Sequence, residues 1–228
     1  MQIVSKRRYC VAGLAICALL DLSVASADTG RFVIDVSDRD GLPVPDAAVY
    51  ALPVETTPAP PATLPPHAFM DQKDRTFVPH ILVAQTGTAI DFPNSDSVSH
   101  HVYSFSPAKP FELALYKQGA VHPPLVFNAP GIVTLGCNIH DNMVGYILVV
   151  DTPYFAMTDA AGRGVLDGLP AGRYRVEVWT PRLRPGEQPQ AIEASVGVGA
   201  TATLETRLTA KLLPAHGAGH SSLTWSHY

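Results

Sequence analysis

Short apolar runs, separated at close intervals by turn residues, are the feature that most constrains the fold of this chain. The runs are RFVIDVS (31–37), DAAVYAL (46–52), TFVPHILVA (76–84), TAIDF (88–92), HHVYSFS (100–106), GIVTLGC (131–137), MVGYILVV (143–150), RYRVEVWT (173–180) and TATLETRL (201–208). In the run at 173–180, Tyr174, Val176 and Val178 fall on one face of an extended chain, which is the pattern of a half-buried strand. No stretch keeps a helical period for three turns, so we predict an all-β fold built from sandwiches.

Composition supports this class and excludes others. The 228 residues include 21 prolines, which are costly inside helices and argue against a helical bundle. With 16 basic and 20 acidic side chains the chain is neither a basic nucleic-acid binder nor, at 46% hydrophobic residues, a disordered acidic chain. We therefore expect no nucleic-acid partner.

The N-terminus is typical of an export signal. A positive start (Lys6, Arg7, Arg8) precedes an apolar run at 11–20, and small residues at 25–27 offer a cleavage site. We predict a signal peptide over 1–27, removed on export to the periplasm, and no membrane span, because no later segment approaches the roughly 20 apolar residues required. Its removal takes away two of the 3 cysteines and leaves Cys137 as the single thiol.

The surroundings of Cys137 suggest a metal centre. In GCNIHDNM a predicted strand ends at Cys137, a five-residue loop carries His140, and Met143 opens the next strand. Soft sulfur ligands together with imidazole select copper, whereas structural zinc wants four cysteine or histidine ligands. A cysteine–histidine nucleophile pair would not explain the methionine. The simplest alternative is a buried cysteine that acts only as a small hydrophobe.

Such a copper site needs a second histidine. His100 and His101 begin a predicted strand, and only one of them can face the metal because consecutive strand residues point to opposite faces. His80 lies inside a predicted strand and His122 lies beside prolines, so we interpret both as structural. The histidines near the C-terminus are interpreted as part of a solvated tail: His216, His220 and His227.

These motifs resemble the blue-copper cupredoxins. The C-x-x-H-x-x-M spacing is that of amicyanin, and residues 70–152 are similar to bacterial cupredoxin-like proteins labelled methylamine utilization protein. The resemblance implies a Greek-key sandwich that binds one copper ion, Cu(I)/Cu(II). It also implies the metal ligands: His100, Cys137, His140 and, as a weak axial ligand, Met143.

The match departs from that family at two places. His101 stands where the family has an asparagine, and Asp141 and Asn142 follow His140 where amicyanin has apolar residues. A carboxylate at Asp141 offers a hydrogen bond near His140, although loop aspartates are usually solvated. In the family the loop histidine is the solvent-facing ligand and the electron exit, so these changes imply a more polar docking surface.

The segments around the copper motifs resemble a second module. Residues 31–53 and 154–180 are similar to successive parts of a carboxypeptidase regulatory-like (prealbumin-like) β-sandwich. We predict that a cupredoxin domain is inserted into this sandwich. Acidic turns at Asp38, Asp40 and Asp159 are explained by turn chemistry rather than calcium. The predicted boundaries are 1–27 signal peptide, 28–54 first regulatory-like strands, 55–66 Pro-rich linker, 67–152 cupredoxin, 153–211 remaining regulatory-like strands and 212–228 tail.

The leading functional hypothesis is one-electron transfer between periplasmic redox proteins, with donor and acceptor unidentified. A metal whose coordination positions are all filled by protein has no place for substrate, and no acid, base and nucleophile converge in the sequence, so we expect no enzyme activity. Two alternatives stay open. One is a copper carrier or sensor without an electron-transfer role, and the other is a β-sandwich binding module without a metal.

Overall fold

The computed structural model describes residues 29–55 and 67–215. Within these residues all regular structure is β-strand, so the predicted all-β class is confirmed. They contain no helix long and apolar enough to cross a membrane. The predicted signal peptide, the linker beyond Glu55 and the three histidines near the C-terminus lie outside the described residues.

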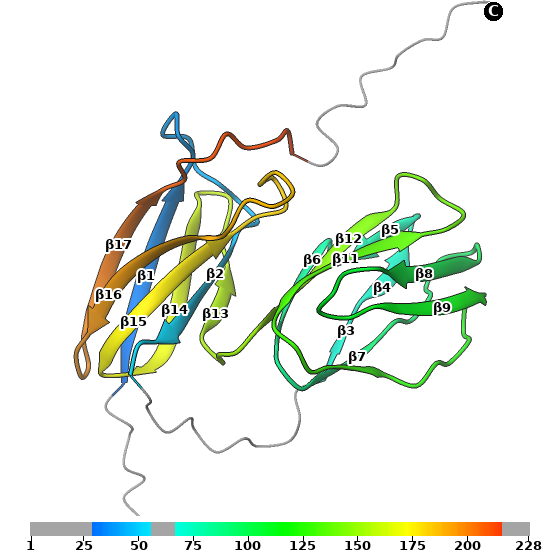
Figure 1. Ribbon diagram of the computed structural model, residues 1–228, viewed down its shortest axis with the longest axis horizontal. Coiled ribbons are helices and arrows are strands. Elements are labelled where there is room, and N and C mark those ends of the chain that lie inside the picture. Colours follow the sequence, from blue (N-terminus) through cyan, green and yellow to red (C-terminus); the bar gives the residue numbers. More distant parts are fainter. Residues whose placement is uncertain (1–28, 56–66, 216–228) are drawn as a thin grey trace, which may run out of the picture.

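Figure 1 shows two groups of strands. The flanking sandwich combines a three-stranded sheet, β14-β1-β17, with a four-stranded sheet, β13-β2-β15-β16. Its strands are β1 (Thr29–Ser37), β2 (Ala48–Pro53), β13 (Phe155–Met157), β14 (Arg163–Pro170), β15 (Gly172–Trp179), β16 (Gln190–Val196) and β17 (Thr201–Arg207).

Strands from both ends of the described chain pair in this sandwich. β2 pairs antiparallel with β15, from Ala48 opposite Trp179 to Pro53 opposite Tyr174. β1 lies between β14, which runs antiparallel to it, and β17, which runs parallel. The segment before residue 55 and the segment after residue 154 therefore contribute strands to the same two sheets. Residues 67–150, which lie between these segments in the sequence, form separate sheets.

The central sandwich contains the predicted metal residues. A five-stranded sheet, β6-β12-β11-β8-β9, and a three-stranded sheet, β10-β7-β3, enclose its core, and β4 and β5 form a separate hairpin. Its strands are β3 (His67–Phe69), β4 (Asp71–Lys73), β5 (Thr76–Val78), β6 (Ile81–Gln85), β7 (Thr88–Asp91), β8 (His100–Ser104), β9 (Phe111–Tyr116), β10 (Leu125–Phe127), β11 (Gly131–Cys137) and β12 (Val144–Val150).

Some predicted details were wrong. The run at 76–84 forms two strands, because the strand is interrupted at Pro79. His80 lies between the two strands rather than inside one. The loop after Cys137 is one residue longer than predicted. Met143 closes it by donating its backbone N–H to the carbonyl of His140 at 3.0 Å, and β12 begins at Val144.

Each sandwich has its own apolar core, and a third cluster joins them. Ile81, Leu148 and Val150 from the central sandwich pack with Trp179 and other residues of the flanking sandwich. The alternation predicted for β15 is confirmed, since Tyr174, Val176 and Val178 lie in the flanking core. Its opposite face is not open to solvent throughout, however, and Glu177 is only 8% exposed.

Candidate metal centre

Strand β11 delivers Cys137 to the core of the central sandwich. Its buried residues alternate, so that Val133, Leu135 and Cys137 face inward, and Cys137 is 5% exposed. The preceding residue, Gly136, lies against Tyr103 of β8, and a Cβ at that position would come within 2.7 Å of the tyrosine ring. The close packing of β11 on β8 thus depends on glycine beside the cysteine, and places Cys137 opposite Val102.

The two histidines at the start of β8 point in opposite directions. His100 is fully buried, and its Nδ1 lies 3.7 Å from the Sγ of Cys137. His101 faces outward, where its Nε2 lies 2.8 Å from a carboxylate oxygen of Glu112. Strand alternation therefore separates the two neighbours, and His100 is the one that reaches Cys137.

The loop between β11 and β12 brings the third donor. A turn in which the His140 N–H donates to the Cys137 carbonyl at 3.4 Å folds the imidazole back toward the thiol. The Nδ1 of His140 lies 3.4 Å from the Sγ of Cys137. Burial, and then the electrostatic influence of His100 and Arg75, lower the pKa of His140. These effects favour the neutral imidazole, which is the form that binds metals.

The three donor atoms form a compact set. The ligand atoms of His100, Cys137 and His140 lie within 4.8 Å of one another, and they are the one such cluster of histidine, cysteine and acidic residues in the described chain. Bonds of about 2.0–2.3 Å in a trigonal plane would separate ligand atoms by roughly 3.7 Å. Both sulfur–nitrogen distances are close to that value, so the residues fit a single metal ion.

Met143 lies in the same core cluster as Cys137 and is 1% exposed. It follows His140 by three residues and closes the metal loop through its backbone hydrogen bond. The structure thus brings together three of the predicted residues by their ligand atoms, and places the fourth in the adjoining core.

A carboxylate that the sequence analysis did not select supports His100. Asp96 is 9% exposed, and its Oδ2 lies 3.1 Å from the Nε2 of His100. The same oxygen accepts the backbone N–H of Arg75 at 2.8 Å, and the other oxygen accepts that of Ser97 at 2.8 Å. The hydrogen bond from Arg75 is the main reason that the pKa of Asp96 is lowered, so the carboxylate stays charged.

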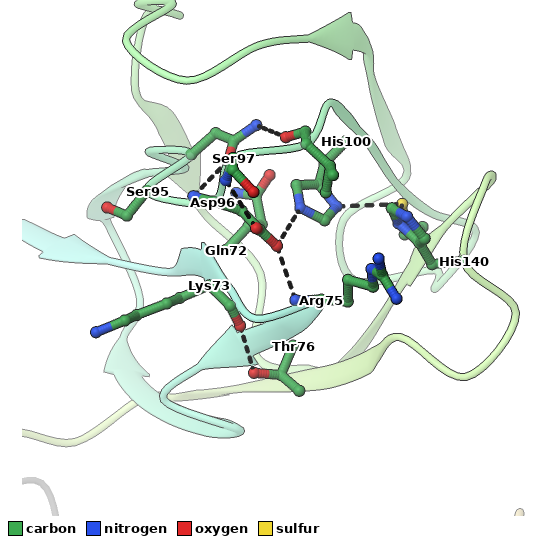
Figure 2. A network of polar contacts seen from close by, with 12 residues as sticks. Gln72, Lys73, Arg75, Thr76, Ser95, Asp96, Ser97, His100 and His140 are labelled. Atoms are coloured by element: carbon green, nitrogen blue, oxygen red, sulfur yellow. Dashed lines mark hydrogen bonds and ion pairs between the residues drawn. The ribbon is translucent and has the colours of Figure 1, made fainter.

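The contact with Asp96 determines which ring nitrogen of His100 faces Cys137 as an acceptor. Figure 2 shows His100 between Asp96 on one side and the sulfur-containing side chain on the other. With the proton on Nε2, His100 donates a hydrogen bond to the ionised carboxylate of Asp96, and the lone pair of Nδ1 is free toward Cys137. The available signal was the position of Asp96, four residues before His100 in a polar turn, whereas Asp141 was the carboxylate predicted near the site. Asp141 is exposed.

The other predicted alternatives lie away from this cluster. The ring of His80 packs edge-on against Tyr146 at 5.5 Å between centroids. The ring of His122 packs edge-on against Tyr116 at 4.5 Å. Neither contributes to the three-residue donor set.

No family model matches the sequence, and no curated protein matches it. Among solved structures, a purple cupredoxin from Nitrosopumilus maritimus aligns with 36% of this chain and 99% of its own, at 23% identity and a TM-score of 0.33. A reduced amicyanin variant aligns with 44% of this chain and 99% of its own, at 18% identity and a TM-score of 0.34.

A copper-containing nitrite reductase from Thermus scotoductus aligns with 43% of this chain and 25% of its own, at 24% identity and a TM-score of 0.35. By name, these neighbours are a purple cupredoxin, an amicyanin variant and a copper-containing nitrite reductase. Because the three TM-scores are below 0.5, the function proposed below rests on the geometry of His100, Cys137 and His140.

Proposed function

We propose that this protein binds one copper ion and carries single electrons between redox partners. The ligands would be His100 Nδ1, Cys137 Sγ and His140 Nδ1, with Met143 as a weak axial ligand. The convergence of the three donor atoms in a buried position is the observation that carries the proposal. When bound, copper would supply a one-electron couple between Cu(I) and Cu(II).

The donor set favours copper over other metals. Two imidazoles and one thiolate with a nearby thioether are the ligands of a type 1 copper site, whereas structural zinc sites complete four strong ligands. Carboxylates, which harder ions prefer, do not enter the cluster within the described residues, and Asp96 faces the far side of the His100 ring.

The surroundings favour electron transfer over substrate chemistry. His100, Cys137 and Met143 are buried, so water and substrates have little access from their side. Rigid packing limits the rearrangement that otherwise slows one-electron exchange: His100 and Cys137 lie on paired strands, and Asp96 fixes the His100 ring. His140 is only partly buried and offers the site its route to the surface. We therefore propose a carrier without enzyme activity.

The remaining parts of the proposal follow from the sequence. The predicted signal peptide over 1–27 supports export and a periplasmic location, where the donor and acceptor would be soluble or membrane-attached redox proteins. A link to methylamine utilization has only the sequence resemblance in its support.

Copper titration of the mature protein tests the proposal. We expect one equivalent of Cu(II) to produce an intense visible thiolate-to-copper absorption, which Cys137→Ala abolishes. His67→Ala is the matched control, because it removes a half-exposed imidazole that pairs with Asp91 outside the cluster. Loss of the band in both variants, or a wild type without the band, would contradict copper binding at this site.

Redox cycling separates the two copper hypotheses. An electron carrier should pass repeatedly between the coloured and colourless forms without losing metal. A protein that takes up copper but releases it on reduction would instead be a copper carrier or sensor.

A further inference from the structure

The two-residue turn of the β4–β5 hairpin has an arginine at a position that favours glycine. Its two central residues, Asp74 and Arg75, have φ values of 52° and 58°, in the left-handed region that glycine and asparagine usually occupy. Residues other than glycine that are held in this region are concentrated at functional sites. The arginine therefore stands where glycine would be the less strained residue.

The turn contacts the proposed copper site through its backbone. The N–H of Arg75 donates to Asp96, and the same carboxylate oxygen faces His100. This hydrogen bond fixes the tip of the hairpin against the metal cluster. It also fixes where the Arg75 side chain begins.

The side chain of Arg75 extends toward His140. Figure 2 shows its guanidinium on the side of the hairpin that faces His140, whereas the side chain of Lys73 extends in the opposite direction. One hairpin thus carries two exposed cations, of which only Arg75 lies at the metal site.

The guanidinium of Arg75 forms no ion pair within the described residues, although the side chain is exposed. Four other arginines pair with carboxylates of distant residues or of the same strand: Arg31 with Asp167, Arg163 with Asp35, Arg173 with Glu55 and Arg175 with Glu177. Arg75 therefore keeps its hydrogen-bond donors available at the surface.

We propose that Arg75 recognises the redox partner, by pairing with a carboxylate on the partner's surface beside His140. The inference rests on the proposed electron-transfer function. A guanidinium matches a carboxylate with two parallel hydrogen bonds. The chain as a whole carries a formal charge of −4, so an acidic partner needs a local cation such as Arg75 for attraction beside His140.

The neighbouring groups complete the surface. Ile139, beside His140, is 49% exposed and offers an apolar contact. Asp74 precedes Arg75 and Asp141 follows His140, and both are exposed. These two carboxylates repel an acidic partner, so that attraction is limited to the guanidinium of Arg75. Arg75 therefore also sets the orientation in which the partner docks.

Oxidation of the reduced copper protein by two inorganic complexes tests the inference. Hexacyanoferrate(III), an anion, and tris(phenanthroline)cobalt(III), a cation, each take one electron from the protein and are reduced to the iron(II) and cobalt(II) complexes. At low ionic strength we expect Arg75→Gln to slow the anion about three- to tenfold and to accelerate the cation. The difference should disappear near 1 M salt, where the Debye length is about 3 Å.

Lys73→Gln is the matched control. It removes the same charge from the same hairpin, but its side chain points away from the site, so we expect a change of less than about twofold. Arg75→Lys should keep most of the rate with the anion. Equal effects of Arg75→Gln and Lys73→Gln would show a dependence on net charge alone and overturn the inference.

A carboxylate-bearing probe completes the test. Hexaglutamate should slow oxidation of the wild type by hexacyanoferrate(III) and leave Arg75→Gln unaffected, while hexaglycine should affect neither. Inhibition of both proteins alike would overturn the role of Arg75. The copper absorption and reversible cycling are recorded first, so that failure of the proposed function is seen there, and failure of the inference is seen only with an intact site.

Discussion

The two sandwiches of this chain differ in whether their buried polar side chains are paired with one another as donors and acceptors. In the flanking sandwich, one carboxylate oxygen of Glu177 accepts a hydrogen bond from the Tyr50 hydroxyl at 2.5 Å. The other oxygen forms an ion pair with Arg175 at 2.6 Å. Burial and the nearby carboxylate raise the pKa of Tyr50, so the phenol keeps its proton as a donor. In the central sandwich, His100, Cys137 and His140 turn their acceptor atoms toward one another.

The difference indicates whether each set of buried polar side chains stabilises packing or offers a site for a ligand. A closed set of donors and acceptors satisfies itself and stabilises packing, as the Tyr50–Glu177 pair does. Converging lone pairs on one sulfur and two nitrogens are unfavourable unless a proton or a metal ion lies between them, and the single thiol proton of Cys137 can serve only one of the two imidazoles. The fold class alone therefore does not distinguish a structural sandwich from a metal-binding one, but the hydrogen-bond accounting of the buried polar atoms does.

The largest expected effect separates the adjacent histidines of β8. We expect His100→Ala to abolish the thiolate-to-copper absorption, because it removes the buried donor that lies 3.7 Å from Cys137. His101→Ala should leave the absorption in place, since its ring pairs with Glu112 on the outer face. Visible spectra and metal content measure both. Retention of the band in His100→Ala would contradict the assigned ligand set.

The next prediction concerns the core of the flanking sandwich. Leu166 is 1% exposed there, and Leu166→Ala should lower the free energy of unfolding by about 2–5 kcal/mol in urea titrations. The adjacent Val165 is 39% exposed, and Val165→Ala should cost much less. The copper spectrum of the folded protein should be unchanged in both. A shifted spectrum in Leu166→Ala would mean that the two cores are not independent.

A third prediction compares the two buried carboxylates directly. Asp96→Asn should weaken copper binding about tenfold, as loss of a carboxylate behind a metal-binding histidine commonly does. It should also raise the reduction potential, because a negative charge near the site stabilises Cu(II). Chelator competition and redox titration measure these effects. Glu177→Gln, in the flanking sandwich, should change neither quantity, and an equal shift in both variants would refute the special role of Asp96.

The smallest effect is expected at the surface of the flanking sandwich. Arg163, directly opposite Asp35 across β1 and β14, lowers the pKa of Asp35 below its ordinary value of 3.8. A depressed folded-state pKa stabilises the protein above pH 3.8, and this contribution is lost as the pH falls through the lowered value. Asp35→Asn should therefore be slightly less stable near pH 7 and should match the wild type in strong acid. A constant difference at all pH values, measured by urea unfolding, would rule out the ion pair as its cause.

Much of the β-structure was predictable from local pattern. The run at 131–137 predicted β11, and the run at 100–106 predicted β8, because alternation and turn residues mark both. Strands with weaker patterns were missed. β14 contains two glycines, Gly164 and Gly168, which usually indicate turns, and Val196 is the only buried residue of β16.

Part of the candidate site was also visible in the sequence. Cys137 and His140 lie three residues apart beyond a strand, so the chain itself keeps them close, and the structure places their donor atoms at 3.4 Å. The sequence contained Asp96 and Arg75 as well, but gave no sign that they meet the cluster. Arg75 is 62 positions before Cys137 in the chain, and only the packing of the β4–β5 hairpin brings it there.

The sequence by itself therefore determined the all-β class and the strand–loop segment that carries Cys137, His140 and Met143, because both depend on residues close together in the chain. Tertiary structure decided which histidine of β8 faces the cysteine, which carboxylate supports it, and which cation stands beside His140. These depend on strand register and on the packing of one sheet against another. A shift of register by one residue would exchange His100 for His101, so the fold selects the donor that local pattern leaves open.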